Sequence, residues 1–201
     1  MPRVVLVCGH TTKVERLEGI DYIGVDHGAY VCAKNHIPMV YAIGDFDSVN
    51  EEEFACIKDA SKTIEKLSTH KDETDTESAI LYALKKGYDD ILLYGGLGGR
   101  LDHEMANLYL LMHRDYPITM INDKNRIRVF HEGIHHCKKA YTYFSFLPLE
   151  KCCISLQGFA YPLDHRILST NDICTISNEI IDKEAQVIVH KGRILVIESD
   201  D

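Results

Sequence analysis

Short apolar runs alternate with helix-like segments from residue 4 to residue 122. The runs have the length of strands, and they are VVLV (4–7), YIGV (22–25), MVYAIG (39–44), DILLYGG (90–96) and ITMIN (118–122). Alternation of this kind is typical of parallel strands joined by crossover connections. The pattern therefore predicts an α/β domain with a parallel sheet.

Two of the intervening segments have the apolar spacing of an α-helix. The segment 72–87 carries an apolar stripe that ends at Gly87, and the segment 100–117 carries another that ends before Pro117. The stripe residues are Ala79, Ile80, Ala83 and Leu84 in the first segment, and Leu101, Met105, Leu108 and Met112 in the second. Such a stripe is usually the side of a helix that faces the core.

After residue 123 the pattern changes to β-rich pieces without a convincing amphipathic helix. The pieces are RIRVF (126–130), YTYFSFLPL (141–149), KCCISLQGF (151–159), CTISNEII (174–181) and AQVIVHKGRILVIES (185–199). The last piece reads as a hairpin that turns near Lys191 and Gly192. We therefore expect an α/β domain at 1–123 and a small all-β domain at 124–201.

The composition, 45% hydrophobic and 26% charged, is that of a globular protein with a buried core. No membrane-spanning run and no signal peptide is predicted. The formal net charge of −9 argues against nucleic-acid binding, which needs a basic face. The seven cysteines form no C-x-x-C pair, which argues against a secreted disulfide framework and favours a cytoplasmic location.

Acidic residues follow the predicted strands at the edge where open parallel sheets bind ligands. Asp26 follows one strand, while Asp45 and Asp47 follow another, on either side of Phe46. Along an extended chain, two residues at this spacing share a face. Their repulsion would be costly unless a cation lay between them, so the pattern favours a bound cation.

More polar groups are expected at the same edge. KDETD contributes Lys71, Asp72, Thr74 and Asp75, and GGLGGRLDH contributes Arg100, Asp102 and His103. Clustered carboxylates without a nearby His/Cys set suit Mg²⁺ or Ca²⁺ rather than zinc. Glycines let backbone N–H groups approach a phosphate, and basic side chains neutralise its charge. These groups favour a nucleotide-dependent phosphoryl or pyrophosphoryl transferase.

Each signal taken alone also has a structural explanation. The aspartates after the strand fit a polar turn, and DETD fits a capping box with Asp72 as the cap. The glycine run matches neither G-x-x-x-x-G-K-[ST] nor G-x-G-x-x-G, and it fits a tight turn. His103 alone fits a helix histidine better than a catalytic base. These explanations leave open why acidic residues converge at three strand ends.

The chain resembles the thiamine pyrophosphokinase family through the ordered motifs VDHGA, GDFDS, KDETD, GGLGGRLDH, GFAYPL and ISNE, from about residue 24 to residue 180. The resemblance implies a Rossmann-like α/β domain that binds ATP and Mg²⁺. It also implies a β-sandwich domain that completes a thiamine site across a homodimer. The implied reaction transfers a pyrophosphoryl group from ATP to the hydroxyl of thiamine, giving thiamine diphosphate and AMP.

The resemblance implies roles for individual residues as well. The metal ligands would be Asp45, Asp47 and Asp75, and these would act in catalysis together with Arg100 and Asp102. The nucleotide and phosphate side would include Asp26, Gly28, Lys71, Thr74, Arg100 and His103. The thiamine side, reached across the dimer, would include Ser177 and Asn178.

Two departures from the family pattern bear on this interpretation. His27 stands where the family usually has a glycine, which puts the close backbone approach expected there in doubt. The chain has no tryptophan, so stacking on the pyrimidine ring of thiamine must come from Tyr or Phe or from the other subunit. Three alternatives are a related transferase for another small alcohol, a non-catalytic sensor and a purely structural α/β protein.

Overall fold

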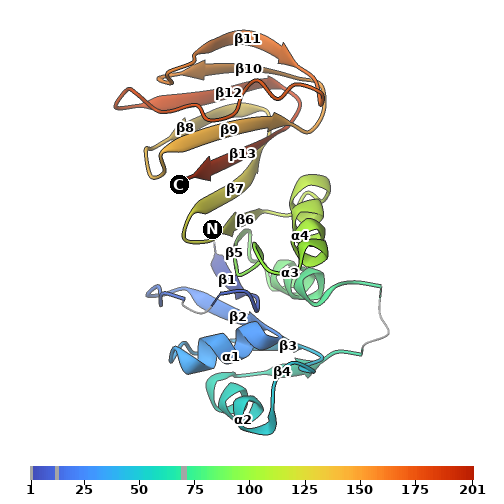
Figure 1. Ribbon diagram of the computed structural model, residues 1–201. Helices are drawn as coiled ribbons and strands as arrows, with labels where there is room; N and C mark the ends of the chain where they lie inside the picture. The colour runs from blue at the N-terminus through green and yellow to red at the C-terminus, as the bar shows by residue number, and fades with distance from the viewer. Residues whose placement is uncertain (1, 12–13, 69–71) are drawn as a thin grey trace. The chain divides into compact units, whose positions relative to one another are not determined.

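The structure, a computed structural model, describes residues 2–11, 14–68 and 72–201. It divides into two compact units, residues 1–122 and 123–201 (Figure 1). The first unit is of α/β type and the second contains only strands. The expected fold class, a parallel-sheet α/β domain followed by a small β-sandwich, is confirmed.

The first unit is built on a parallel sheet. Its strands are β1 (Arg3–Val7), β2 (Asp21–Val25), β3 (Tyr41–Gly44), β4 (Ile64–Lys66), β5 (Asp90–Tyr94) and β6 (Ile118–Ile121), in the spatial order β4-β3-β2-β1-β5-β6. The chain moves outward from β1 to β4 and then returns to the other side of β1 with β5. The switch point therefore lies between β1 and β5, where sheets of this kind bind ligands.

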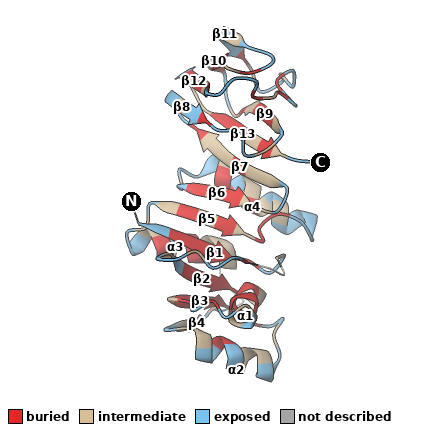
Figure 2. Ribbon diagram, turned by 90° about the vertical axis from the view of Figure 1, so that its left-hand side faces the viewer, coloured by how far each residue is buried: buried red, intermediate tan, exposed pale blue. Residues whose placement is uncertain are grey.

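Helices cover both faces of this sheet. They are α1 (His27–Lys34), α2 (Glu51–Ala60), α3 (Asp75–Lys85) and α4 (Leu101–His113). Val5 and Val7 of β1 pack in one cluster with residues of α1 and α2. Val4 and Leu6, on the opposite face of the same strand, are also fully buried. Figure 2 shows β1 in the colour of buried residues. Burial on both faces explains why this strand reads as a continuous apolar run.

The two predicted helices differ in how well their buried faces were predicted. In α3 the stripe residues Ala79, Ile80 and Ala83 are buried, as expected. In α4 the prediction was wrong, because Leu101 is 70% and Met105 is 42% exposed. The buried residues of α4 are Asn107, Leu110 and Leu111. Since apolar residues surround much of this helix, their spacing did not determine which side faces the sheet.

The second unit consists of two antiparallel sheets packed around one core. One sheet has the order β7-β13-β9, with β7 (Asn125–Phe130), β13 (Ile194–Ser199) and β9 (Tyr143–Pro148). The other has the order β11-β10-β12-β8, with β11 (Leu163–Leu168), β10 (Cys152–Gln157), β12 (Ala185–Lys191) and β8 (Gly133–Cys137). Phe144, Phe146 and Val196 from the first sheet pack with Ile154 and Val187 from the second. This arrangement is a β-sandwich.

Two local predictions in this unit were wrong. Residues 185–199 do not form a hairpin, because β12 pairs with β10 and β8 whereas β13 pairs with β7 and β9. The turn at Gly192 instead carries the chain from one sheet to the other. The segment 174–181 forms only isolated bridges, Phe144 with Asn178 and Phe159 with Ile180.

None of the described helices is long and apolar enough to cross a membrane.

Candidate active site

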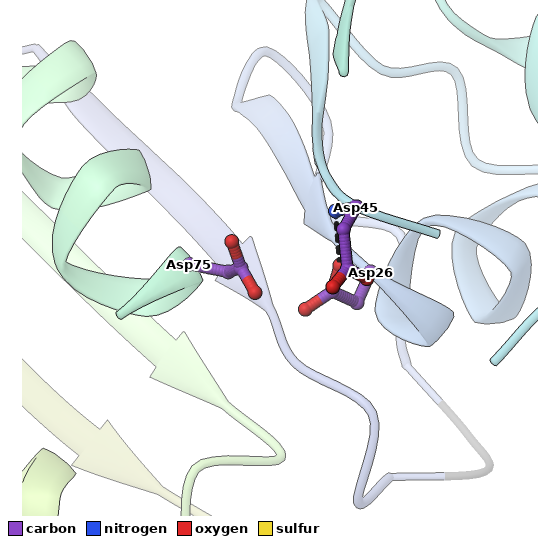
Figure 3. Close-up of side chains that lie close together, drawn as sticks. All are labelled: Asp26, Asp45 and Asp75. Carbon is purple, nitrogen blue, oxygen red and sulfur yellow. Dashed lines mark hydrogen bonds between the residues drawn. The ribbon is translucent and has the colours of Figure 1, made fainter. Parts of the chain in front are cut away.

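Three carboxylates from separate elements converge at the carboxyl ends of the parallel strands. Asp26 follows β2, Asp45 follows β3, and Asp75 is the first residue of α3. One carboxylate oxygen from each residue lies within 4.8 Å of the others. Figure 3 shows the side chain of Asp75 pointing toward those of Asp26 and Asp45. The predicted convergence of acidic groups at this edge is therefore present in the fold.

The backbone around β2 and β3 fixes the Asp26 carboxylate in place. The Asp26 N–H donates to the Ile43 carbonyl at 2.9 Å, and the Asp45 N–H donates to Asp26 Oδ1 at 3.1 Å. A Cβ atom added at Gly44 would lie 1.8 Å from Asp26 Oδ1, so the close approach requires glycine. Asp26 itself has a φ of 49°, which is strained for a residue with a side chain.

Burial and neighbouring carboxylates make this group electrostatically unfavourable without a cation. Burial, together with a hydrogen bond to Asp75 and repulsion from Asp75 and Asp45, raises the pKa of Asp26 to about 7. Opposite oxygen ligands of Mg²⁺ lie roughly 4 Å apart, because each Mg–O bond is about 2.1 Å. The observed spacing and the all-oxygen donor set therefore fit a hard divalent cation.

Asp47 is placed differently from the other aspartates. The chain is not extended here, because β3 ends at Gly44 and the buried Phe46 has a φ of 56°. The expectation that Asp45 and Asp47 share a face of an extended chain was therefore wrong. The Asp47 N–H donates to Asp45 Oδ1 at 3.1 Å, and the exposed Asp47 lines the adjoining cavity. Its role as a metal ligand stays a prediction.

Two adjoining cavities open at the carboxylate group. The first, of about 360 Å³, contains the three aspartates, and the second, of about 340 Å³, extends along the glycine-rich loop after β5. Residues that line both cavities are Asp26, Thr76, His103 and Asn107. The Asn107 side chain is buried and donates to the Gly96 carbonyl at 3.0 Å, which ties α4 to the loop.

The start of α4 carries an ion pair beside the glycine-rich loop. Arg100 binds Asp102 through two hydrogen bonds, of 3.1 Å from Nε and 2.6 Å from a terminal nitrogen. Both side chains are exposed, and Arg100 lowers the pKa of Asp102 to about 2. Asp102 and His103 line the first cavity, and Arg100 and His103 line the second. The expected site residues on α4 are therefore at the cleft.

The start of α3 differs from the capping box considered above. The helix begins at Asp75 with Thr74 as its N-cap, and the Thr74 hydroxyl accepts from the Glu77 N–H at 3.1 Å. Asp72 therefore does not cap the helix. Thr74 and Asp75 both line the first cavity. Lys71 lies outside the described residues.

Gly28 has a packing role that the sequence alone did not reveal. A Cβ atom at this position would lie 1.9 Å from the Val7 carbonyl oxygen, so glycine lets α1 pack against the end of β1. Gly28 is not among the residues that line the two cavities, whereas its neighbour His27 is. The His27 ring also contacts Tyr30 edge to face, with ring centroids 5.7 Å apart.

The predicted thiamine-side residues are in the second unit, beside a cavity of about 180 Å³. Asn178 lines this cavity but is buried, and its side chain bonds both the N–H and the carbonyl of Tyr161. Ser177 has a φ of 55°, and its N–H donates to Ser145 Oγ at 3.1 Å. Asn178 therefore holds the segment 177–179 against Tyr161, a positioning role that the motif did not indicate.

Sequence reasoning missed several residues of the cleft. Thr76, Asn107 and Cys8 line it, and the Cys8 thiol contacts the Thr76 hydroxyl at 3.5 Å. Burial raises the pKa of Cys8 to about 12, so it stays a neutral thiol. Asn107 could have been found, because it lies four residues after His103 on the same side of α4. Nothing in the sequence marked Cys8, since it continues an apolar strand.

A switch-point cleft with clustered carboxylates and a glycine-rich loop defines the class of nucleotide-dependent transferases. Comparisons with known proteins narrow this class. Residues 20–121 match the model of the thiamin pyrophosphokinase catalytic domain, and residues 131–194 match that of its vitamin B1 binding domain. Thiamine pyrophosphokinase of Bacillus subtilis (strain 168) is 34% identical over 187 residues, covering 90% of this chain and 87% of that protein.

Solved structures agree with this result. A thiamine pyrophosphokinase structure from Bacillus subtilis matches with a TM-score of 0.89 and 31% identity, covering 99% of each chain. A family member from Enterococcus faecalis matches with a TM-score of 0.88 and 27% identity, again covering 99% of each chain. The chain belongs to the thiamin pyrophosphokinase family, ATP-dependent enzymes that transfer a pyrophosphoryl group to thiamine and form thiamine diphosphate.

Proposed function

We propose that this chain transfers the pyrophosphoryl group at the cleft of its first unit, with ATP bound along the glycine-rich loop. The observation that supports this most strongly is the convergence of Asp26, Asp45 and Asp75 beside that loop. The carboxylates come from three elements that are far apart in sequence. Repulsion among these carboxylates destabilises the fold, so a purely structural role does not explain why they lie together.

Asp26, Asp45 and Asp75 would hold Mg²⁺, and Asp47 would reach the same region from the adjoining cavity. Held by these residues, a magnesium ion would screen the carboxylates from the polyphosphate and would supply positive charge for the leaving group. Without such screening, the acidic cleft would repel the triphosphate. The proposal therefore makes activity dependent on a divalent metal.

The remaining groups of the cleft would bind and align the substrates. Arg100 has an exposed guanidinium beside the second cavity, where it can donate to phosphate oxygens. Thr74 lines the first cavity and His103 lines both, and Asp102 would offer a negative charge to the thiazolium cation. Alignment and charge neutralisation would then supply most of the rate enhancement.

The proposal includes a homodimer, as the family resemblance implies, with Ser177 and Asn178 on the thiamine side of the partner subunit's site. Asn178 holds its segment in a defined shape, which suits a binding surface. Sedimentation velocity tests the oligomeric state directly, and a monomer that retains full activity would contradict this part.

A cytoplasmic location also belongs to the proposal, because all seven cysteines are free thiols in the structure.

The test is to incubate the purified protein with thiamine, ATP and Mg²⁺ and to separate the products by chromatography. We expect thiamine diphosphate and AMP in equal amounts, and no product after EDTA is added. Thiamine monophosphate with ADP would indicate a different kinase. Thiamine binding without any product would contradict the enzymatic proposal and favour a sensor.

A further inference from the structure

The loop after β1 packs directly against the glycine-rich loop after β5. These strands are neighbours in the sheet, and the Cys8 N–H donates to the Tyr94 carbonyl at 2.8 Å. A Cβ atom added at Gly95 would lie 2.3 Å from the Cys8 carbonyl oxygen and 3.0 Å from the Thr11 nitrogen. The first contact between the two loops is therefore between their backbones.

The second contact is made by the imidazole of His10. A Cβ atom added at Gly99 would lie 1.8 Å from both Cε1 and Nε2 of His10, so the ring occupies the space beside the Gly99 α-carbon. Gly99 has a φ of 80°, which also favours glycine. His10 thus contacts the end of the glycine-rich loop, immediately before Arg100.

His10 also lines the second cavity, together with His27, Arg100 and His103. The residue is exposed on its other side, so it contributes little to the hydrophobic core. The glycine-rich loop has four glycines, three of them with positive φ, and such a loop loses much conformational freedom when it orders around a ligand. A ring packed on Gly99 reduces that cost before the ligand arrives.

We propose that His10 is a positioning residue for ATP binding, which holds the glycine-rich loop and Arg100 in the shape that receives the polyphosphate. The inference rests on the proposed use of this loop for ATP. It assigns the effect to the packed ring rather than to a hydrogen bond from the imidazole. The effect should appear in ATP binding and leave thiamine binding and the chemical step nearly unchanged.

The first experiment compares three replacements of His10. In His10→Ala the KM for ATP should rise about 10-fold, with kcat and the KM for thiamine within about twofold of the wild type. In His10→Phe, which keeps a planar ring, the KM for ATP should stay within about twofold of the wild type. If His10→Phe lost ATP binding while His10→Gln kept it, the proposal would be overturned. The result would show that a hydrogen bond from the side chain to ATP is needed, rather than a packed ring. An unchanged KM in His10→Ala would overturn it outright.

The second experiment uses two glycines of the same loop as a matched pair. Gly98 has a φ of 96° and Gly99 a φ of 80°, but a Cβ atom at Gly98 meets nothing within 4 Å. Both alanine variants are therefore strained, while only Gly99→Ala displaces the His10 ring. The double variant with Gly98→Ala and His10→Ala should bind ATP about 10-fold more weakly than Gly98→Ala alone. The double variant with Gly99→Ala and His10→Ala should bind ATP as well as Gly99→Ala alone, because the ring is already displaced. Equal, independent effects in both pairs would contradict the proposal.

ATP binding is measured by calorimetry with Mg²⁺ present, a readout that does not need turnover. If the wild type binds ATP but forms no thiamine diphosphate, the proposed function fails while the His10 comparison can still be made. If turnover is normal and the His10 variants bind ATP like the wild type, the inference about His10 fails alone.

Discussion

Charged side chains gather in both units, and the two groups differ in the ion pairs that the described residues form. In the second unit, Glu198 is completely buried and forms ion pairs with Arg126 and Arg128. In the first unit, the carboxylates of Asp26 and Asp45 face that of Asp75, and among the described residues no lysine or arginine forms an ion pair with Asp26 or Asp45. In the second unit the fold itself supplies the counter-charge to Glu198, whereas the lack of a paired cation at Asp26 and Asp45 among the described residues favours a ligand that supplies one.

The backbone conformation also differs between the two groups, being regular at Glu198 and strained at Asp26. Glu198 and Arg126 are directly opposite each other on neighbouring strands β13 and β7, and Arg128 lies two residues further along the same face. Asp26 is held by a strained backbone and by the absence of a side chain at Gly44. Strain that serves no packing purpose is typical of functional sites.

The largest expected effect comes from Asp45→Asn. Turnover should fall by at least about 100-fold, because the variant loses a proposed metal ligand and the charge stabilisation that the metal would supply in the cleft. Its melting temperature should equal or exceed that of the wild type, since one of three repelling charges is removed. Steady-state kinetics and thermal melting measure the two effects. A variant with full activity would contradict the metal site, and a large loss of stability would make the aspartates structural.

Glu198→Gln should have the opposite profile. It leaves two arginines without their buried partner and should lower the free energy of unfolding by about 3 kcal/mol. The activity per folded molecule should be unchanged. Glu150→Gln is the matched control, because the Glu150 side chain is 48% exposed in its pair with Arg193, and its loss should cost under about 0.5 kcal/mol. Urea unfolding compares the two variants, and equal costs would contradict the distinction.

The pH dependence of stability tests the Asp26 carboxylate without substrates. The pKa of Asp26 is raised to about 7 in the folded protein, so between pH 4 and pH 7 the folded state binds more protons than the unfolded state. The stabilisation from this proton is complete below about pH 4 and is lost as the pH rises through 7.

In EDTA, the wild type should therefore lose on the order of 2 kcal/mol of stability across that window relative to Asp26→Asn. Asp89→Asn, at an exposed position, should follow the wild type. Identical pH profiles for the wild type and Asp26→Asn would show that Asp26 is not perturbed.

The smallest effect on the fold is expected for Arg100→Gln. Its pair with Asp102 is exposed, so the free energy of unfolding should be nearly unchanged. The KM for ATP should nevertheless rise about 10-fold, because the guanidinium proposed to bind phosphate is lost. Kinetics and urea unfolding report these changes separately. A loss of stability without a change in KM would assign Arg100 to the fold.

The sequence predicted the elements whose patterns are periodic and long. Five of the six strands of the first unit, α3 and the change to a β-rich second unit could be recognised, whereas the three-residue strand β4 was not predicted. The buried face of α4 could not, because Leu101 and Met105 are as apolar as Leu110 and Leu111. The false hairpin at Gly192 arose because a turn between two alternating strands looks the same whether the strands pair or enter different sheets.

The candidate site was predictable to a similar degree. The positions of Asp26, Asp45 and Asp75 at one edge followed from the rule for parallel sheets. The local geometry did not, because the left-handed conformation of Phe46 breaks the extended spacing assumed for Asp45 and Asp47. Contacts such as that of His10 with Gly99 depend on how loops pack in space, and no spacing in the sequence records them.

The central claim is that Asp26, Asp45 and Asp75 form a divalent metal site that the reaction uses. Titration of Mn²⁺ into the EDTA-treated protein with ATP present, followed by electron paramagnetic resonance of the free ion, tests it most directly. We predict saturable binding in the wild type and in Asp89→Asn, and at least about 100-fold weaker binding in Asp45→Asn. Equal Mn²⁺ affinity in Asp45→Asn and the wild type would contradict the claim.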